Sequence, residues 1–141
     1  MNISFDFDNT LTDPRVRSMA VDMRRQGATI WIVTSRWDDE NAPSEAWNMD
    51  LWGMADRLKI PKERVIFMNF RRKVEFFEQS SVSFEFHIDD CSNETDEIRQ
   101  MMLATPRRED RTRRFPVPIN HFNDPEWHGK CWKIFERAKN G

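Results

Sequence analysis

Two pairs of carboxylates stand at the ends of apolar runs, where they could share a site. Asp6 and Asp8 end a run that begins at Asn2, and Asp89 and Asp90 end a later run. If the first run is a strand, side-chain alternation places Asp6 and Asp8 on the same side, so that the two carboxylates converge. Converging carboxylates can hold a hard metal ion, act as a nucleophile or move protons.

Hydroxyl and basic side chains follow two further apolar runs. Thr34 and Ser35 close the run that begins at Ala28, where a hydroxyl and a backbone turn could hold a phosphate oxygen. Lys73 follows the run over residues 64–68 and offers a cation at the head of a helix. Taken singly, these residues are equally typical of a helix cap or a solvated basic turn. Their recurrence at the ends of successive runs favours a shared site.

Five apolar runs predict strands, and apolar residues at helical spacing between them predict helices. The expected strands are Asn2 to Phe7, Ala28 to Thr34, Arg64 to Met68, Phe84 to Asp89 and Phe115 to Ile119. The expected helices pass through Val16 and Met23, Trp47 and Leu58, Phe76 and Phe77, and Ile98 and Met102, and a C-terminal helix spans about residues 125–139. Asp13 and Asp124 each precede a proline, a pattern typical of a helix N-terminus.

Strands that alternate with helices are typical of an α/β fold. We expect a doubly wound, mostly parallel five-stranded sheet of the Rossmann-like kind, with the last strand at an edge because it contains Pro116 and Pro118. Ligands bind such sheets at the carboxyl ends of the strands. The carboxylates, the hydroxyls and Lys73 all come at such ends.

Composition limits the classes of function. The chain has 141 residues, of which 38% are hydrophobic and 33% charged, and this predicts one globular domain over 1–141, no membrane association and a cytoplasmic location. A net charge of -2 argues against bulk binding to polyanions. The four glycines form no dinucleotide-binding or P-loop pattern. Cys91 and Cys131 lack the spacing of a zinc ribbon or a disulfide framework, so both are expected as reduced thiols.

The order of these elements resembles the haloacid dehalogenase (HAD) superfamily of aspartate-nucleophile phosphotransferases. The run Ile3-Ser4-Phe5-Asp6-Phe7-Asp8-Asn9-Thr10 looks like its first motif, Thr34 like its second, Lys73 like its third, and Asp89-Asp90 like its fourth. The motifs lie within residues 3–94. Asn9 and Ser35 stand where glycine is frequent in the family. The short segments after the first and third strands leave no room for a cap domain, so the resemblance implies a minimal, capless HAD-like fold with an open site.

The resemblance also implies a mechanism. Asp6 would be the nucleophile that forms an aspartyl-phosphate, and Asp8 the general acid and base. Magnesium would be held by Asp6, the backbone carbonyl of Asp8, and Asp89, with Asp90 as a direct or indirect helper. The transferring phosphoryl oxygens would be held by Thr34, Ser35 and Lys73. The expected activity is magnesium-dependent hydrolysis of phosphomonoesters, with Mg²⁺ as cofactor.

Two alternatives use similar parts. Receiver domains of bacterial signalling also combine acidic residues, a hydroxyl, a lysine and magnesium, but they place their acidic pair near the first strand and the acceptor aspartate later. A non-catalytic HAD-like module would keep the magnesium site and hold a polyanionic or protein partner. Retention of all the expected side chains argues against this second alternative.

Substrate choice rests on a basic segment and on two tryptophans. Residues 107–114 carry five arginines against Glu109 and Asp110, a local charge of +3 (5 − 2). This segment, with Arg111, Arg113 and Arg114, is either a solvated loop or a clamp for nucleic-acid ends. Arg36 and Trp37 follow the second motif, and Trp37 or Trp47 could stack on a base at the mouth of the site or belong to the core.

Other aromatic and metal-binding residues have plainer interpretations. Packing roles are expected for Trp31, Trp52, Trp127 and Trp132. A second metal site at His121, His128 and Cys131 is a weaker hypothesis, because Cys131 also fits the apolar stripe of the last helix. The open site could also be covered by another subunit.

Overall fold

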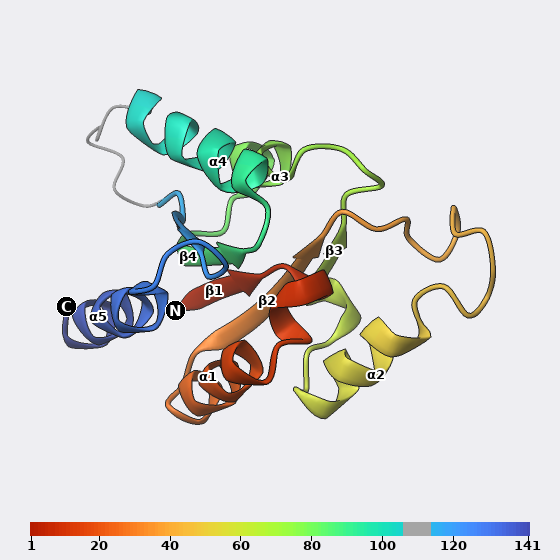
Figure 1. The fold of residues 1–141 in the computed structure, drawn as a ribbon, viewed down its shortest axis with the longest axis horizontal. Coiled ribbons are helices and arrows are strands. Elements are labelled where there is room, and N and C mark those ends of the chain that lie inside the picture. Colours follow the sequence, from red (N-terminus) through yellow and green to blue (C-terminus); the bar gives the residue numbers. More distant parts are fainter. Residues whose placement is uncertain (106–113) are drawn as a thin grey trace.

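The sheet is the five-stranded parallel sheet expected from the sequence. The computed structural model describes residues 1–105 and 114–141. The strands are β1 (Asn2–Phe5), β2 (Thr29–Thr34), β3 (Val65–Phe67), β4 (Phe84–Asp89) and β5 (Val117–Asn120). Every pairing is parallel, and the strand order is β3-β2-β1-β4-β5 (Figure 1). The edge position expected for the proline-containing strand is therefore confirmed.

Helices cover both faces of the sheet. They are α1 (Pro14–Arg25), α2 (Met49–Arg57), α3 (Lys73–Gln79), α4 (Ser92–Ala104) and α5 (Trp127–Asn140). Figure 1 shows α3 and α4 above the sheet, and α1, α2 and α5 below it. The doubly wound α/β fold is confirmed. The segments 6–13 and 68–72, which join β1 to α1 and β3 to α3, are too short to contain a cap domain.

Each face of the sheet has its own apolar core. The core under α1, α2 and α5 includes Ile3 and Phe5 from β1, with Phe86 and Ile88 from β4. The core under α3 and α4 is smaller and is formed by Val33, Met68, Val74, Phe77, Phe84 and Ile98. Because alternate residues of a strand face opposite sides, the polar residues between those of the first core face α3.

The chain reverses its winding direction between β1 and β4. The connection through α1 leads from β1 to β2 on one side, whereas the connection through α4 leads from β4 to β5 on the other. The carboxyl ends of β1 and β4 are neighbours at this point, and such a switch point is where open α/β sheets bind ligands.

Several element boundaries differ from the sequence predictions, including those of the first strand and of the second and last helices. The first strand ends at Phe5, because the next residues form an irregular turn over Phe7–Leu11 in which Asn9 has φ 58°. The second predicted helix begins at Met49, so Trp47 precedes it. The last helix begins at Trp127, because the Asp124 carboxylate accepts the N–H of Glu126 at 2.9 Å in a turn before the helix.

Four of the tryptophans have the expected packing roles. The Trp31 ring packs against Phe84 with centroids 5.2 Å apart, and its indole donates to Asn2. Trp127 is buried, and Trp52 and Trp132 pack against the larger core. Both cysteines are free thiols.

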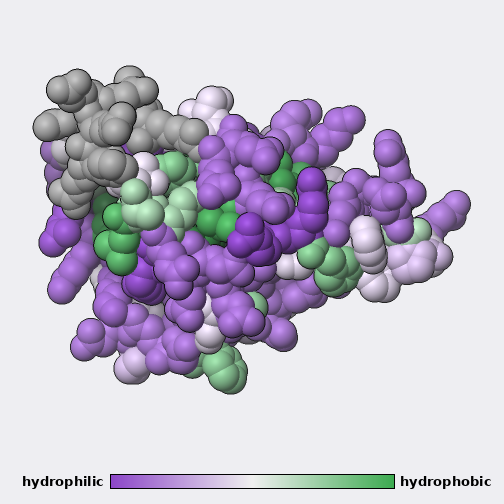
Figure 2. Space-filling model, turned by 90° about the horizontal axis from the view of Figure 1, so that it is seen from above, coloured by the Kyte–Doolittle hydropathy of each residue, from purple (hydrophilic) through white to green (hydrophobic). Residues whose placement is uncertain are grey.

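The surface is mainly polar. Figure 2, which views the molecule from the side of α3 and α4, shows a largely hydrophilic face with hydrophobic residues in small groups. In the part of the chain that the structure describes, none of the helices has the length and apolar character to cross a membrane.

Candidate active site

The register of the central strands places Asp6 level with Asp89. Phe5 of β1 pairs with Ile88 of β4, and the Asp6 N–H donates to the Ile88 carbonyl at 2.8 Å. Asp6 and Asp89 are therefore neighbours at the carboxyl edge of the sheet. Both side chains are buried on the face that α3 covers.

Lys73 joins these two carboxylates. It is the first residue of α3, and its Nζ lies 2.7 Å from Oδ1 of Asp6 and 2.6 Å from Oδ2 of Asp89. The Lys73 side chain is only 2% exposed. A buried ammonium needs carboxylates this close, because the ion pairs and hydrogen bonds must offset its loss of hydration. Glu94 on α4 fixes the start of α3 by accepting the N–H of Lys73 at 2.9 Å.

Burial and neighbouring charges shift the pKa values of Asp6, Asp89 and Lys73 in different directions. Burial raises the pKa of Asp6 well above its ordinary value, and the charge of Lys73 offsets only part of this effect. Burial also acts to raise the pKa of Asp89, but the hydrogen bond from His87 and the charge of Lys73 outweigh it and hold that pKa below its ordinary value. Burial acts to lower the pKa of Lys73, but the two carboxylates outweigh it and raise that pKa. Asp89 and Lys73 are therefore firmly ionised, and Asp6 is the carboxyl most readily protonated.

A buried histidine supports Asp89 from within the sheet. His87 Nε2 lies 2.9 Å from Oδ2 of Asp89, and Nδ1 lies 2.8 Å from Oγ of Ser4. Burial lowers the pKa of His87, which favours the neutral ring. Because the ionised Asp89 can only accept, Nε2 must carry the proton and Nδ1 must accept from the Ser4 hydroxyl. This chain of hydrogen bonds fixes both the tautomer and the orientation of the ring.

Thr10 contacts the other oxygen of Asp6. Its Oγ1 donates to Oδ2 of Asp6 at a long 3.4 Å and lies 3.1 Å from Nε2 of His121. A threonine from the turn after β1 and a histidine from the segment after β5 therefore support the same carboxylate. Asp6 is held from both sides, by Lys73 at Oδ1 and by Thr10 at Oδ2.

Asp6, Asp89 and Asp90 could together hold a cation. One carboxylate oxygen from each lies within 4.8 Å of the others, and this is the one group of three or more potential metal-ligating residues among residues 1–105 and 114–141. All the donors are hard oxygens, which Mg²⁺ prefers. Three carboxylates against the single ammonium of Lys73 leave two formal negative charges (3 − 1), which a divalent cation would balance. The residues therefore fit a magnesium ion.

Asp8 faces a different partner from Asp6. Its carboxylate is half exposed and accepts two hydrogen bonds from Arg36, at 2.7 Å and 3.0 Å. The strand alternation expected to bring Asp6 and Asp8 together does not extend beyond Phe5. The same guanidinium binds Asp50 of α2 at 2.8 Å and 3.0 Å. Arg36 therefore fixes Asp8 by anchoring it to a helix.

Thr34 and Ser35 lie at the carboxyl end of β2, as the sequence predicted. Thr34 is the last residue of β2 and is fully buried, and its Oγ1 accepts the N–H of Arg36 at 3.3 Å. Ser35 follows it, and the Ser35 carbonyl accepts the N–H of Phe70 at 2.7 Å. Trp37 is partly exposed at the surface beside these residues.

The structure describes only Arg114 of the basic segment, and it does not support the second metal site. Arg107, Arg108, Arg111 and Arg113 lie outside the described residues. The exposed Arg114 guanidinium lies 3.2 Å from an oxygen of Glu85, a partly buried residue of β4. Cys131 is in the apolar core, where burial raises the pKa of its thiol. His121 contacts Thr10, and His128 instead contacts Trp132. These residues do not form a metal-binding group.

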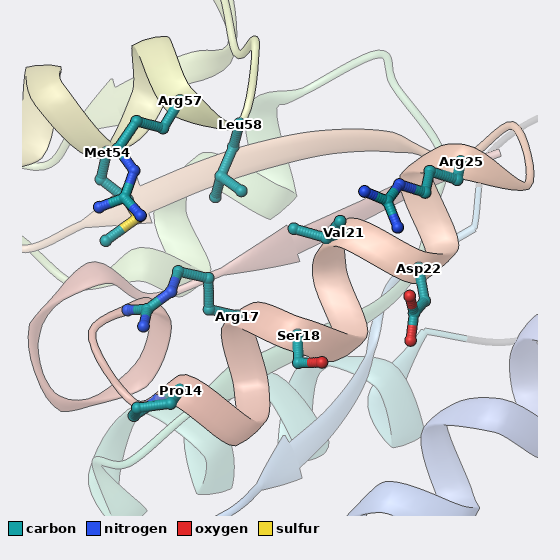
Figure 3. Close-up of a pocket in the computed structure, with 9 residues that line it drawn as sticks. All are labelled: Pro14, Arg17, Ser18, Val21, Asp22, Arg25, Met54, Arg57 and Leu58. Atoms are coloured by element: carbon teal, nitrogen blue, oxygen red, sulfur yellow. The ribbon is translucent and has the colours of Figure 1, made fainter.

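Of two hollows in the surface, only the first adjoins the site. A cleft of about 1230 Å³ opens beside Asp90 and is lined also by Asn9, His121 and Phe122. Figure 3 shows a smaller groove of about 390 Å³ between α1 and α2, where Arg17, Arg25 and Arg57 surround an apolar floor. The groove lies on the face of the sheet opposite α3, so the carboxylate cluster does not include it.

Four supporting residues were given no role in the site by the sequence prediction, although Ser4 and Thr10 fall inside the first motif. Ser4 and His87 are polar residues inside otherwise apolar strands. This exception to the apolar pattern could have indicated that they belong to the site. Thr10 and Glu94 gave no such signal, because hydroxyls in turns and acids in a first helical turn are common.

A scan of protein-family models and searches of curated proteins and of solved structures return no match for this chain.

Proposed function

We propose that this chain is a magnesium-dependent phosphomonoester phosphatase of the HAD type that acts through an aspartyl-phosphate on Asp6. The observation that carries the proposal is the buried Lys73 that contacts both Asp6 and Asp89 beside Asp90, at the switch point of the sheet. A phosphomonoester is a dianion, so its hydrolysis depends mainly on positioning and on neutralising charge. The cluster supplies a fixed nucleophile and a cation within contact of it.

The first chemical step transfers the phosphoryl group to Asp6. A carboxylate oxygen of Asp6 forms a bond to phosphorus while the bond to the leaving oxygen breaks, and Asp8 gives a proton to that oxygen. In the second step water forms a bond to phosphorus, Asp8 accepts its proton, and the bond to Asp6 breaks. Phosphate leaves, and both carboxyl groups return to their starting states.

The remaining residues stabilise the transferring group. Lys73, Thr34 and Ser35 would hold phosphoryl oxygens, which offsets the repulsion between Asp6 and the phosphate. Magnesium held by Asp6, Asp89 and Asp90, with the Asp8 carbonyl, would neutralise phosphoryl charge and favour the ionised form of Asp6. Arg36 holds the ionised form of Asp8 through both carboxylate oxygens, so one of these bonds must open when Asp8 carries the proton. Nucleotides and nucleic-acid ends are the first substrates to test.

Hydrolysis of a generic aryl phosphate tests the proposal. We expect turnover that requires Mg²⁺, that a chelator abolishes, and that falls by at least about 10³-fold in Asp6→Asn. Asp22→Asn, an exposed carboxylate on α1, is the matched control and should keep wild-type turnover. Undiminished hydrolysis by Asp6→Asn would remove Asp6 from the role of nucleophile. A folded wild-type protein that binds Mg²⁺ but hydrolyses no ester would support the binding-module alternative.

A further inference from the structure

We infer that Trp37 and Phe70 form a binding surface for a planar aromatic leaving group, such as a nucleobase. This inference rests on the proposed function and names the class of ester that the site would accept. The rings of Trp37 and Phe70 are 5.1 Å apart at 62°, and the residues are 37% and 61% exposed.

Most of the exposed large apolar side chains come from the same part of the chain as this pair. Among residues 1–105 and 114–141, four of the six exposed large hydrophobic residues lie in the segments after β2 and β3 or at the start of α2, namely Trp37, Trp47, Met49 and Phe70. In Figure 1 the segment after β2, coloured orange to yellow, extends well beyond the sheet. A surface of this kind that the core does not use is a candidate for binding another molecule.

The backbone holds Phe70 in an unfavourable conformation. Asn69 and Phe70 have φ values of 51° and 61°, in the left-handed region that bulky residues rarely adopt. The Phe70 N–H donates to the Ser35 carbonyl at 2.7 Å, and the Asn69 N–H donates to the Arg36 carbonyl at 3.1 Å. These bonds fix the segment after β3 against the segment after β2. Strain that the surrounding structure maintains is typical of functional sites.

Trp37 is also fixed by its neighbours. Its carbonyl accepts from the Asn48 side-chain amide at 2.9 Å. The next residue, Asp38, donates its N–H to the Asn69 side chain at 2.8 Å. The two aromatic residues are thus held by side-chain and backbone bonds, and both rings remain partly open to solvent.

The position of the pair matches the expected path of the leaving group. In the proposed mechanism Asp8 protonates the leaving oxygen, and the Asp8 carboxylate is held by Arg36, the residue before Trp37. Phe70 comes three residues before Lys73, which would hold the phosphoryl group. Trp37 thus adjoins the residue that holds Asp8. Phe70 is hydrogen-bonded to Ser35 of the same segment, so we expect a group that leaves on the Asp8 side to reach this pair. Aromatic rings bind planar rings by stacking, which tolerates different bases.

Kinetics with two esters test the inference. The measured quantity is the ratio of kcat/KM for a nucleoside 5′-monophosphate to kcat/KM for glycerol phosphate, which lacks a ring. We expect this ratio to fall roughly 5- to 100-fold in Phe70→Asn and in Trp37→Leu, through loss of the nucleotide reaction. Asparagine tolerates positive φ, so Phe70→Asn removes the ring without adding strain. Phe122→Ala, an 83% exposed phenylalanine on the cleft beside Asp90, is the control and should leave the ratio unchanged.

A binding measurement separates this inference from the proposed function. Asp6→Asn protein should show tryptophan fluorescence quenching by a nucleoside 5′-monophosphate, and addition of Trp37→Leu should remove most of it. An equal fall in kcat/KM for both esters in Phe70→Asn would overturn the aromatic surface. A fall in the ratio that occurs in Phe122→Ala alone would also overturn it. If wild type hydrolyses no ester, the phosphatase proposal fails, and quenching that depends on Trp37 would still support the aromatic surface. If both esters are hydrolysed equally and no quenching occurs, the phosphatase proposal stands and the aromatic surface does not.

Discussion

The ammonium of Lys73 lies 2.7 Å from Oδ1 of Asp6, although Asp6 follows β1 and Lys73 begins α3. The contact exists because the polar face of β1 points towards the helix that follows β3. The same ammonium contacts Asp89 at 2.6 Å, so one buried cation joins two strand ends. Removal of the cation would leave two buried carboxylates facing each other.

Lys73→Met should abolish turnover and lower the free energy of unfolding by about 3–5 kcal/mol, because it leaves buried charge without a partner. Lys130→Met is the matched control, since Lys130 forms an ion pair of 2.6 Å with Asp124 at the surface. Lys130→Met should lower the free energy of unfolding by less than about 1 kcal/mol. Urea denaturation with and without Mg²⁺ measures both variants. Similar losses in the two variants would contradict the structural role given to Lys73.

Asp6→Asn should be more stable than wild type at neutral pH when a chelator is present. Burial raises the pKa of Asp6, so its favourable contribution is present below its unfolded pKa of about 3.9 and is lost as pH rises through the folded pKa. Asparagine does not ionise, so the variant does not lose this contribution as pH rises. The gain should be on the order of 1 kcal/mol, and the melting temperature should rise by roughly 2–5 °C. Thermal melts between pH 4 and 8 test this, and a variant that is less stable throughout would refute it.

Asp89→Asn should have the opposite effect. His87 and Lys73 outweigh burial and hold the pKa of Asp89 low, so this carboxylate stabilises the fold above about pH 3.9 and the contribution disappears as pH falls through the folded pKa. The variant should lose about 3 kcal/mol at pH 7. Melts extended from pH 7 down to about pH 2 provide the measurement. A loss that does not shrink at low pH would mean that charge is not the cause.

The proton of His87 should reside on Nε2. The ionised Asp89, 2.9 Å from Nε2, can only accept a hydrogen bond, so Nε2 donates. The Ser4 hydroxyl, 2.8 Å from Nδ1, then donates to Nδ1. Nitrogen NMR shifts of the ring should show a protonated Nε2 and an unprotonated Nδ1. Ser4→Ala should cost about 1 kcal/mol, because Nδ1 loses its donor. Observation of the other tautomer would mean that the ring does not donate to Asp89.

Arg36→Lys should reduce kcat/KM by about 10- to 100-fold, because a lysine amine cannot bind Asp8 and Asp50 with two parallel bonds each. Asp50→Asn is the comparison, since it weakens only the anchor on α2 and leaves the contact with Asp8 intact. It should reduce kcat/KM less. Steady-state kinetics on an aryl phosphate decide between them. Full activity in Arg36→Lys would show that Asp8 needs no guanidinium.

The sequence predicted the sheet and the main residues of the site because both depend on local patterns. Apolar runs and their polar ends indicated the five strands, and the parallel arrangement brings Asp6, Thr34 and Asp89 to one edge. Regular strand alternation would put Phe84 and Phe86 on one face, but the register of β1 against β4 shifts by one residue before Ser4. The shift puts Phe84 and Phe86 in different cores.

The partner of Asp8 depends on contacts that local patterns do not encode. The strand stops at Phe5, and the following turn includes a positive φ at Asn9. Asp8 then faces Arg36, which is 28 residues away in sequence. A tertiary ion pair of this kind cannot be read from a strand pattern. The same is true of Ser4 and His87, whose contact requires the shifted register.

Both outer edges of the sheet resist extension by another strand. At one edge β3 is only three residues long. At the other, Pro118 of β5 has no N–H to offer, and its carbonyl already accepts from Arg99 at 3.5 Å. A second copy of the chain therefore finds little backbone to pair with. If another subunit covers the open site, it must dock through helices and loops, and the sheet stays confined to one molecule.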